Sequence, residues 1–227
     1  MSYRNKLIIK PVPNQDLRAF HEIRRNYGSG HETWEDTLYH YEKWPELSMA
    51  AYLEDPASIK KKGNWRTFPP ENLIGIAVGK PFDKSWDQIV NPPADDYAVF
   101  VGESILLDSI CIDHRYWRKG FGSRLLAYFE GQAARMGKRR VVLGAAENID
   151  AFYLANGYEI VLISVWVERT KLPEQYEKLG YEIARFYESC GEVGLHIPAN
   201  KYEPKRREEI KRAYNADQAN YCYKKEV

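Results

Sequence analysis

Apolar and polar positions recur along this chain with two periods, which predict an ordered series of strands and helices. Short apolar runs bounded by proline, glycine or charged residues predict strands at 7–9, 49–53, 73–78, 105–112, 141–143 and 159–167. A recurrence of about 3.6 residues predicts helices after Asp16, which we expect to be the N-cap, over 31–44, and after Gly122. This order predicts an α+β domain with a mixed sheet.

The helix expected after Gly122 has one continuous apolar face. Its apolar residues at helical spacing are Leu125, Leu126, Phe129, Ala133 and Met136. Such a stripe is typical of a core-facing helix, and Gly137 is placed to end it. Further along, Asn148 is placed to cap a short helix that ends near Asn156 and Gly157.

A long segment separates the last two strands. The run 219–223 alternates as a strand that could pair with 159–167, so residues 168–218 form an insertion. The insertion has a helical pattern around Tyr176, Leu179 and Ile183. An excursion of this length either builds a wall of a binding site or adds packing, and the sequence leaves both roles open.

Composition and charge exclude several classes of protein. The 227 residues suit one domain, 1–227, and the 44% hydrophobic and 29% charged fractions suit a globular protein. No apolar run has the length of a membrane span or a leader, so we expect a cytoplasmic protein without membrane contact. A net charge of +1 gives no reason to expect nucleic acid as a partner. The cysteines and histidines lack ligand spacing, so we expect no metal.

The segment from 105 to 126 combines a strand, a basic loop and the start of a helix. Gly120 and Gly122 would let a diphosphate approach the backbone amides of the helix start, and Arg118 and Lys119 would meet it from the side. A Walker A loop is excluded because Lys119 precedes the glycine. A dinucleotide fingerprint is disfavoured because Leu125 stands where a small residue is needed.

Two motifs in order resemble the GNAT superfamily of acyl-CoA-dependent N-acyltransferases. The run 117–122, Trp-Arg-Lys-Gly-Phe-Gly, is similar to the pyrophosphate signature of the family, Gln/Arg-x-x-Gly-x-Gly/Ala, with Trp117 at the Gln/Arg position. The run 148–158 is similar to its second cofactor motif. The resemblance implies a GNAT-like mixed, mostly antiparallel central sheet flanked by helices. The insertion before the last strand is a departure from a minimal family member. The resemblance also implies acetyl-CoA as the acyl donor.

The same resemblance implies roles for particular residues. The diphosphate would lie against Arg118, Lys119, Gly120, Phe121, Gly122 and Ser123. The pantetheine arm would lie along the backbone of Ile110 and Ile112 in a splayed sheet, with contacts to Asn148 and Phe152. Tyr153 would protonate the leaving thiolate, although it could instead pack the short helix on the sheet. Since Phe152 and Tyr153 are adjacent, only one of them can face the core squarely.

The general base is a choice among alternatives. Asp108 lies inside an otherwise apolar strand, where a carboxylate needs a partner or a function, and its parity predicts a face shared with Ile110 and Ile112. Glu103 and a chain of waters are the rivals. We expect direct attack of an amine, on a small molecule or a protein, in a ternary complex without a covalent intermediate. Two other classes stay open: a non-catalytic acyl-CoA-binding module and a protein-interaction module, and a homodimer is compatible with either.

Overall fold

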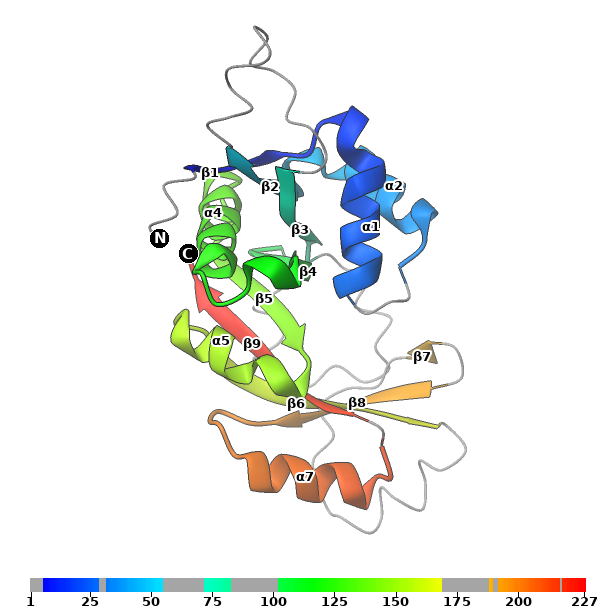
Figure 1. The fold of residues 1–227 in the computed structure, drawn as a ribbon. Helices are drawn as coiled ribbons and strands as arrows, with labels where there is room; N and C mark the ends of the chain where they lie inside the picture. The colour runs from blue at the N-terminus through cyan, green and yellow to red at the C-terminus, as the bar shows by residue number, and fades with distance from the viewer. Residues whose placement is uncertain are drawn as a thin grey trace, which may run out of the picture. The chain divides into compact units, whose positions relative to one another are not determined.

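The computed structural model describes residues 6–28, 32–54, 72–82, 102–168, 188–189, 192–216 and 218–227 (Figure 1). It divides into two compact units. The first unit is Met1–Lys80 with Leu107–Gly137, and the second is Pro81–Leu106 with Lys138–Val227. The helix expected around 176–183 lies outside the described residues.

The first unit is built on four neighbouring strands. They are β1 (Lys6–Pro11), β2 (Ser48–Glu54), β3 (Leu73–Pro81) and β4 (Ser104–Ile112). The first three pair in antiparallel fashion, with Leu7 opposite Leu53 and Met49 opposite Ala77. Nearly every residue of β2 and β3 is buried, which is why these strands are continuous apolar runs and do not alternate in polarity.

Two helices pack on one face of these strands (Figure 1). They are α1 (Leu17–Tyr27) and α2 (Trp34–Lys43), and α2 begins with a capping box between Thr33 and Asp36. Their apolar residues close a core with side chains from the sheet. The core includes Phe20, Ala50, Tyr52, Ile76, Val78 and Cys111. The helices expected from the period of about 3.6 residues are therefore confirmed.

Asp16 is the N-cap residue of α1, but its side chain does not cap the helix. The carboxylate is buried and accepts a hydrogen bond of 2.6 Å from the Tyr52 hydroxyl. This partner lies 36 positions away in the sequence. The predicted N-cap position is confirmed, but the side chain makes no capping hydrogen bond, and its Oδ2 accepts from Tyr52 instead.

The third helix of this unit, α4 (Phe121–Arg135), carries the predicted apolar face. Leu125, Leu126, Phe129 and Ala133 are all 0% exposed. The helix ends just before Gly137, whose φ of +73° is the left-handed conformation expected of a C-terminal glycine. The predicted stripe and the predicted end of the helix are both confirmed.

The second unit holds the remaining strands. The first residues of β4, Ser104–Leu106, pair in parallel with β5 (Arg140–Ala145). The strands that follow across the sheet are β9 (Ala219–Glu226), β6 (Glu159–Glu168), β8 (Glu192–Pro198) and β7 (Glu188–Ser189), all antiparallel to their neighbours. Helices α5 (Asp150–Ala155) and α7 (Pro204–Ala213) complete the unit.

These pairings confirm the predicted class of fold. The strands pair mostly antiparallel, with one parallel pair, and helices accompany them. The segment between β6 and its late partner β9 contains β7, β8 and α7, so the insertion before the last strand is confirmed as well. Among the helices described, none has the length and apolar character needed to cross a membrane.

Candidate functional site

The basic glycine loop leads from the end of β4 to the start of α4. Arg118 has φ +58° and Gly120 has φ +77°, so the backbone is left-handed at both positions. A Cβ atom added at Gly120 would meet nothing within 4 Å, which means that this side of the backbone faces open space. The loop is exposed from Trp117 to Gly120. Glycine is needed at 120 for its conformation, and the space beside it suits a ligand.

The start of α4 offers amide groups for an anion. Gly120 is the N-cap and supplies no side-chain acceptor, and the first turn contains no acidic residue. The amides of Phe121, Gly122 and Ser123 therefore have no partner from the helix itself. The helix dipole adds positive charge at the same place. The residues present fit a diphosphate.

The two basic side chains of the loop differ in their contacts. Lys119 folds back on the loop, where its Nζ donates to the Arg115 carbonyl at 2.8 Å and lies 5.2 Å from the centre of the Tyr116 ring. Arg118 is exposed and makes no hydrogen bond or ion pair to the described residues. Of the two cations predicted beside the diphosphate, Arg118 is the one whose charge is available.

Trp117, at the position of Gln or Arg in the family signature, ties the loop to β4. Its side-chain Nε1 donates to the Ile112 carbonyl at 2.6 Å, while 59% of the residue stays exposed. Trp117 therefore anchors the loop to β4 even though it departs from the signature. The Ile112 carbonyl has two lone pairs and can accept a second hydrogen bond.

A second anchor lies at the beginning of the loop. The carboxylate of Asp113 accepts a forked pair of hydrogen bonds from Arg115, the shorter at 2.6 Å, and also accepts from the Arg115 amide. The Asp113 amide donates to the Ile74 carbonyl of β3. The hydrogen bonds from Arg115 hold the pKa of the Asp113 carboxyl below its usual range. The loop is therefore held at its beginning by Asp113 and further along by Trp117.

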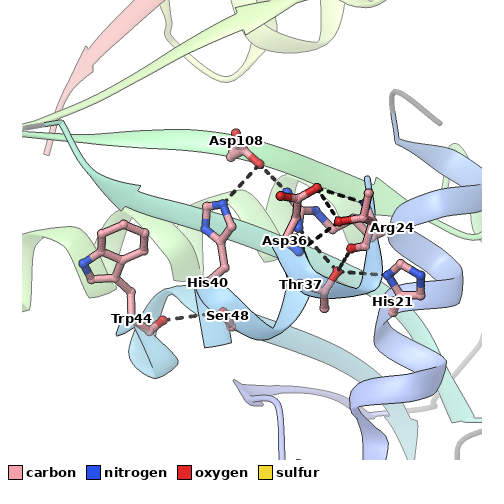
Figure 2. Close-up of polar contacts among 9 residues, drawn as sticks. His21, Arg24, Asp36, Thr37, His40, Trp44, Ser48 and Asp108 are labelled. Atoms are coloured by element: carbon pink, nitrogen blue, oxygen red, sulfur yellow. Dashed lines mark hydrogen bonds and ion pairs between the residues drawn. The ribbon is translucent and has the colours of Figure 1, made fainter. Parts of the chain in front are cut away.

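Asp108 on β4 belongs to a polar cluster with side chains of α1 and α2 (Figure 2). Its Oδ2 accepts a hydrogen bond from Arg24 Nη2 at 2.6 Å, and the Arg24 side chain is 3% exposed. His40 Nε2 lies 3.9 Å from the same oxygen. Thr37 links the two helices, since its hydroxyl contacts both Arg24 and His21. The Asp108 side chain is 27% exposed, so it is the outer member of this cluster.

His40 is a buried imidazole within this cluster. Burial lowers its pKa below the ordinary 6.5, while Asp108 opposes the shift and Arg24 reinforces it. Its side chain is 8% exposed. A histidine in this state is neutral near pH 7 and can accept a proton.

Asp108 and Cys111 of β4 both lie close to the first two helices. Asp108 accepts a hydrogen bond from Arg24 of α1, and Cys111 belongs to the core against which α1 and α2 pack. Along β4, Asp108, Ile110 and Ile112 are less buried than Leu107 and Cys111.

Cys111 itself is a packing residue. It is 5% exposed, and burial raises the pKa of its thiol to about 12. A thiol with this pKa is protonated at neutral pH and is a poor nucleophile. Among the described residues, no group of three or more His, Cys, Asp or Glu side chains is arranged to hold a metal.

In the second unit, Tyr153 is the residue of the aromatic pair that faces the core. It is 4% exposed, whereas Phe152 is half-buried. The Tyr153 ring lies 5.4 Å from the ring of Tyr223 and 5.6 Å from that of Tyr158. Of the two adjacent aromatic residues on α5, Tyr153 is therefore the one that is buried in the core.

Two other predictions in this unit have definite outcomes in the structure. Asn148 lies in a 3-10 turn, Glu147–Ile149, and the N-cap of α5 is Ile149, without a side-chain cap. The capping role predicted for Asn148 is therefore wrong, because the turn moves the N-cap by one residue, from 148 to 149. Glu103, the rival base, is 45% exposed and lies 3.6 Å from Arg139 and 3.5 Å from Arg140.

Sequence reasoning missed Arg24 and His40. A signal was available for Arg24, which shares the buried face of α1 with Leu17 and Phe20 at helical spacing. A cation on an apolar stripe requires a buried partner. His40 likewise shares the buried face of α2 with Thr37.

Comparisons with known proteins identify the family. The family model described as the acetyltransferase (GNAT) family matches residues 17–158. The mosquito arylalkylamine N-acetyltransferase-like protein 5b is similar in structure, with 12% identity over 98% of this chain and all of the other, and a TM-score of 0.57. Ard1 from Thermoplasma volcanium has 14% identity over 97% of each chain and a TM-score of 0.54. The search of curated proteins finds no match.

The fold and the family match define an acetyltransferase. The matched region covers both motifs, from the start of α1 to Tyr158. This chain belongs to the GNAT acetyltransferase family. The resemblance identified from the sequence is confirmed.

Proposed function

We propose that this protein transfers an acetyl group from acetyl-CoA to an amine by direct attack in a ternary complex. The observation that carries the proposal is the start of α4. A left-handed Gly120 with open space beside it precedes a 15-residue helix that has no cap side chain and no acidic residue in its first turn. Membership of the GNAT family supports acetyl transfer as the reaction.

The loop residues bind the donor through its diphosphate. The amides of Phe121, Gly122 and Ser123 donate hydrogen bonds, and Arg118 supplies a charge that no described residue neutralises. Lys119 acts mainly by closing the loop on the Arg115 carbonyl.

The backbone of Ile110 and Ile112 holds the pantetheine arm, with Asn148 and Phe152 as further contacts. Ile110 and Ile112 lie near the end of β4 and are partly exposed. Trp117 already donates to the Ile112 carbonyl and thereby holds this strand end against the loop.

Tyr153 acts as the general acid. Acetyl-CoA supplies an acyl group activated as a thioester, whose sulfur leaves as a thiolate and needs a proton. The tyrosine hydroxyl donates that proton, which avoids the release of a free thiolate. The ring contacts with Tyr158 and Tyr223 fix the direction of the side chain.

Asp108 accepts the proton of the attacking amine or holds that amine in place. Arg24 and His40 both lie on the Oδ2 side of the carboxylate, so Oδ1 is the oxygen that can meet the acceptor. The ion pair with Arg24 keeps the carboxylate in one orientation. His40 Nε2 lies 3.9 Å from Oδ2, and burial lowers the pKa of this imidazole, so it adds little positive charge beside the carboxylate near pH 7.

Thermal unfolding with and without acetyl-CoA tests the donor site. At a ligand concentration a hundredfold above Kd, binding adds about 2.7 kcal/mol, which raises the Tm by roughly 5–10 °C. Gly120→Asp should abolish the shift. Gly137→Asp is the matched control, because Gly137 also has a positive φ and open space beside it but lies at the far end of α4. No shift in the wild type would contradict the donor site.

A thiol-release assay with a panel of amines tests the reaction. The panel includes small aliphatic and aromatic amines, amino sugars and peptides with a free amino terminus, so the acceptor class is read directly. We expect Tyr153→Phe to lower kcat by about 10²–10⁴-fold. A wild type that binds acetyl-CoA but turns over with no amine would support a non-catalytic module instead.

A further inference from the structure

The insertion helix α7 is attached to α5 by a buried ion pair. Arg207 Nη1 donates to Asp150 Oδ2 at 2.6 Å, and the two side chains are 7% and 3% exposed. The other oxygen of Asp150 accepts a hydrogen bond of 2.6 Å from the Tyr223 hydroxyl. Both oxygens of this carboxylate are therefore used.

A second pair connects the same two segments. Lys211, one turn after Arg207 on α7, donates to Glu147 at 3.0 Å. Glu147 lies in the 3-10 turn just before α5 and also accepts from the Ala219 amide at 3.2 Å. One face of α7 thus holds both the turn and the first residue of α5.

These contacts lead directly to Tyr153. Asp150 begins α5, and Tyr153 lies one turn later on the same short helix. The Tyr223 hydroxyl donates to Asp150, and the Tyr223 ring lies 5.4 Å from the ring of Tyr153 at an interplanar angle of 33°. A displacement of Asp150 would therefore move Tyr153 through the helix backbone and through Tyr223.

A buried ion pair adds little to the free energy of unfolding, because its desolvation offsets most of the attraction between the charges. Apolar residues of the same volume often dock two elements equally well, because the pair must first lose its hydration. What the pair adds is direction, since two short hydrogen bonds at one carboxylate allow a single arrangement. An ion pair of this kind is suited to holding a neighbouring side chain in one position.

We propose that α7 of the insertion is a positioning element for the acetyl-transfer site, and that Arg207 places Tyr153 through Asp150 and Tyr223. The inference rests on the proposed role of Tyr153 as general acid. It assigns to the insertion a function in the reaction besides added packing.

A double-mutant cycle on kcat tests the proposal. Arg207→Lys keeps the charge and loses the geometry, and a small displacement of a reacting group lowers kcat by roughly 10–100-fold. We expect that loss with the Kd of acetyl-CoA unchanged by calorimetry. In the Tyr153→Phe background, Arg207→Lys should cost nothing further. Arg206→Lys is the matched control, since Arg206 is the preceding residue of α7 and pairs with Glu203 at 3.4 Å near the surface.

Each contrary outcome is recognisable. Losses that add in the double variant, or an equal loss in Arg206→Lys, overturn the positioning role. Full kcat in Tyr153→Phe overturns it as well, while turnover by the wild type still supports the transferase. A wild type without turnover refutes the proposed function first, and this inference with it. If Arg207→Lys does not fold, Tyr223→Phe carries the same prediction, because it removes only the hydroxyl donor to Asp150.

Discussion

Removing the carboxylate of Asp108 should destabilise the protein more than removing the guanidinium of Arg24. The reason is the difference in burial between the two partners, 27% exposed for Asp108 and 3% for Arg24. Asp108→Ala leaves a buried cation without its hydrogen-bonded carboxylate, with the Thr37 hydroxyl at 3.5 Å and the more distant charge of Asp36 as weaker compensation. Arg24→Met leaves a carboxylate that water can reach.

The magnitudes follow from the cost of an unpaired buried charge. Loss of one partner of a buried pair costs about 3–5 kcal/mol, so we expect about 3 kcal/mol for Asp108→Ala. For Arg24→Met we expect about 1 kcal/mol, because methionine fills the space and Asp108 regains hydration. The double variant should resemble Arg24→Met alone, which gives a coupling of about 2–3 kcal/mol between the two positions.

Urea unfolding followed by circular dichroism measures these differences. The free energy of unfolding is compared among the wild type, both single variants and the double variant, and unchanged m-values show that the comparison is valid. Asp108→Asn, which keeps the shape and one acceptor oxygen, is the conservative control. The reasoning is refuted if Arg24→Met costs more than Asp108→Ala, or if the two losses simply add.

Three further predictions concern other groups of the first unit. Since burial lowers the folded-state pKa of His40 below the ordinary 6.5, its contribution to stability is complete above 6.5 and is lost as the pH falls from there through the folded-state pKa. His40→Gln should therefore flatten the dependence of the unfolding free energy on pH between 7.5 and about 5, and an unaltered profile would contradict the assignment. Tyr52→Phe removes the hydrogen bond to buried Asp16 and should cost about 1.5–3 kcal/mol in urea unfolding, whereas a neutral effect would mean that the bond is not formed. Trp117→Phe loses the hydrogen bond to the Ile112 carbonyl, worth about 0.5–1.5 kcal/mol, and should speed amide exchange in the loop; unchanged exchange would show that the indole does not hold it.

Local chemistry explains why so much of the fold was predictable. The stripe on α4, the left-handed glycines at its two ends and the apolar runs of β2 and β3 each depend on neighbours within a few residues. Side-chain period and turn conformation are properties of short segments. The glycine loop before α4 was predictable for the same reason, because it is a loop and the first turn of one helix.

Two cap predictions failed for different reasons. Asp16 is the N-cap residue of α1, but its side chain makes no capping hydrogen bond and instead accepts one from Tyr52 of β2. Asn148 lies in a 3-10 turn, and the helix that follows begins at Asp150, so its N-cap is Ile149. Local pattern places the end of a helix only to within about one or two residues.

Local patterns in the sequence were enough to predict strands β1 to β6 and β9, the apolar faces of the helices, the glycine loop and the family. They did not predict β7 or β8. Which charges meet depends on the packing of distant elements: Arg24 reaches Asp108 across 84 positions, and Arg207 reaches Asp150 across 57. The same packing turns Tyr153, and not Phe152, toward the core. Periodicity and turn chemistry act within a few residues, whereas the partner of a buried charge is set when distant elements pack together.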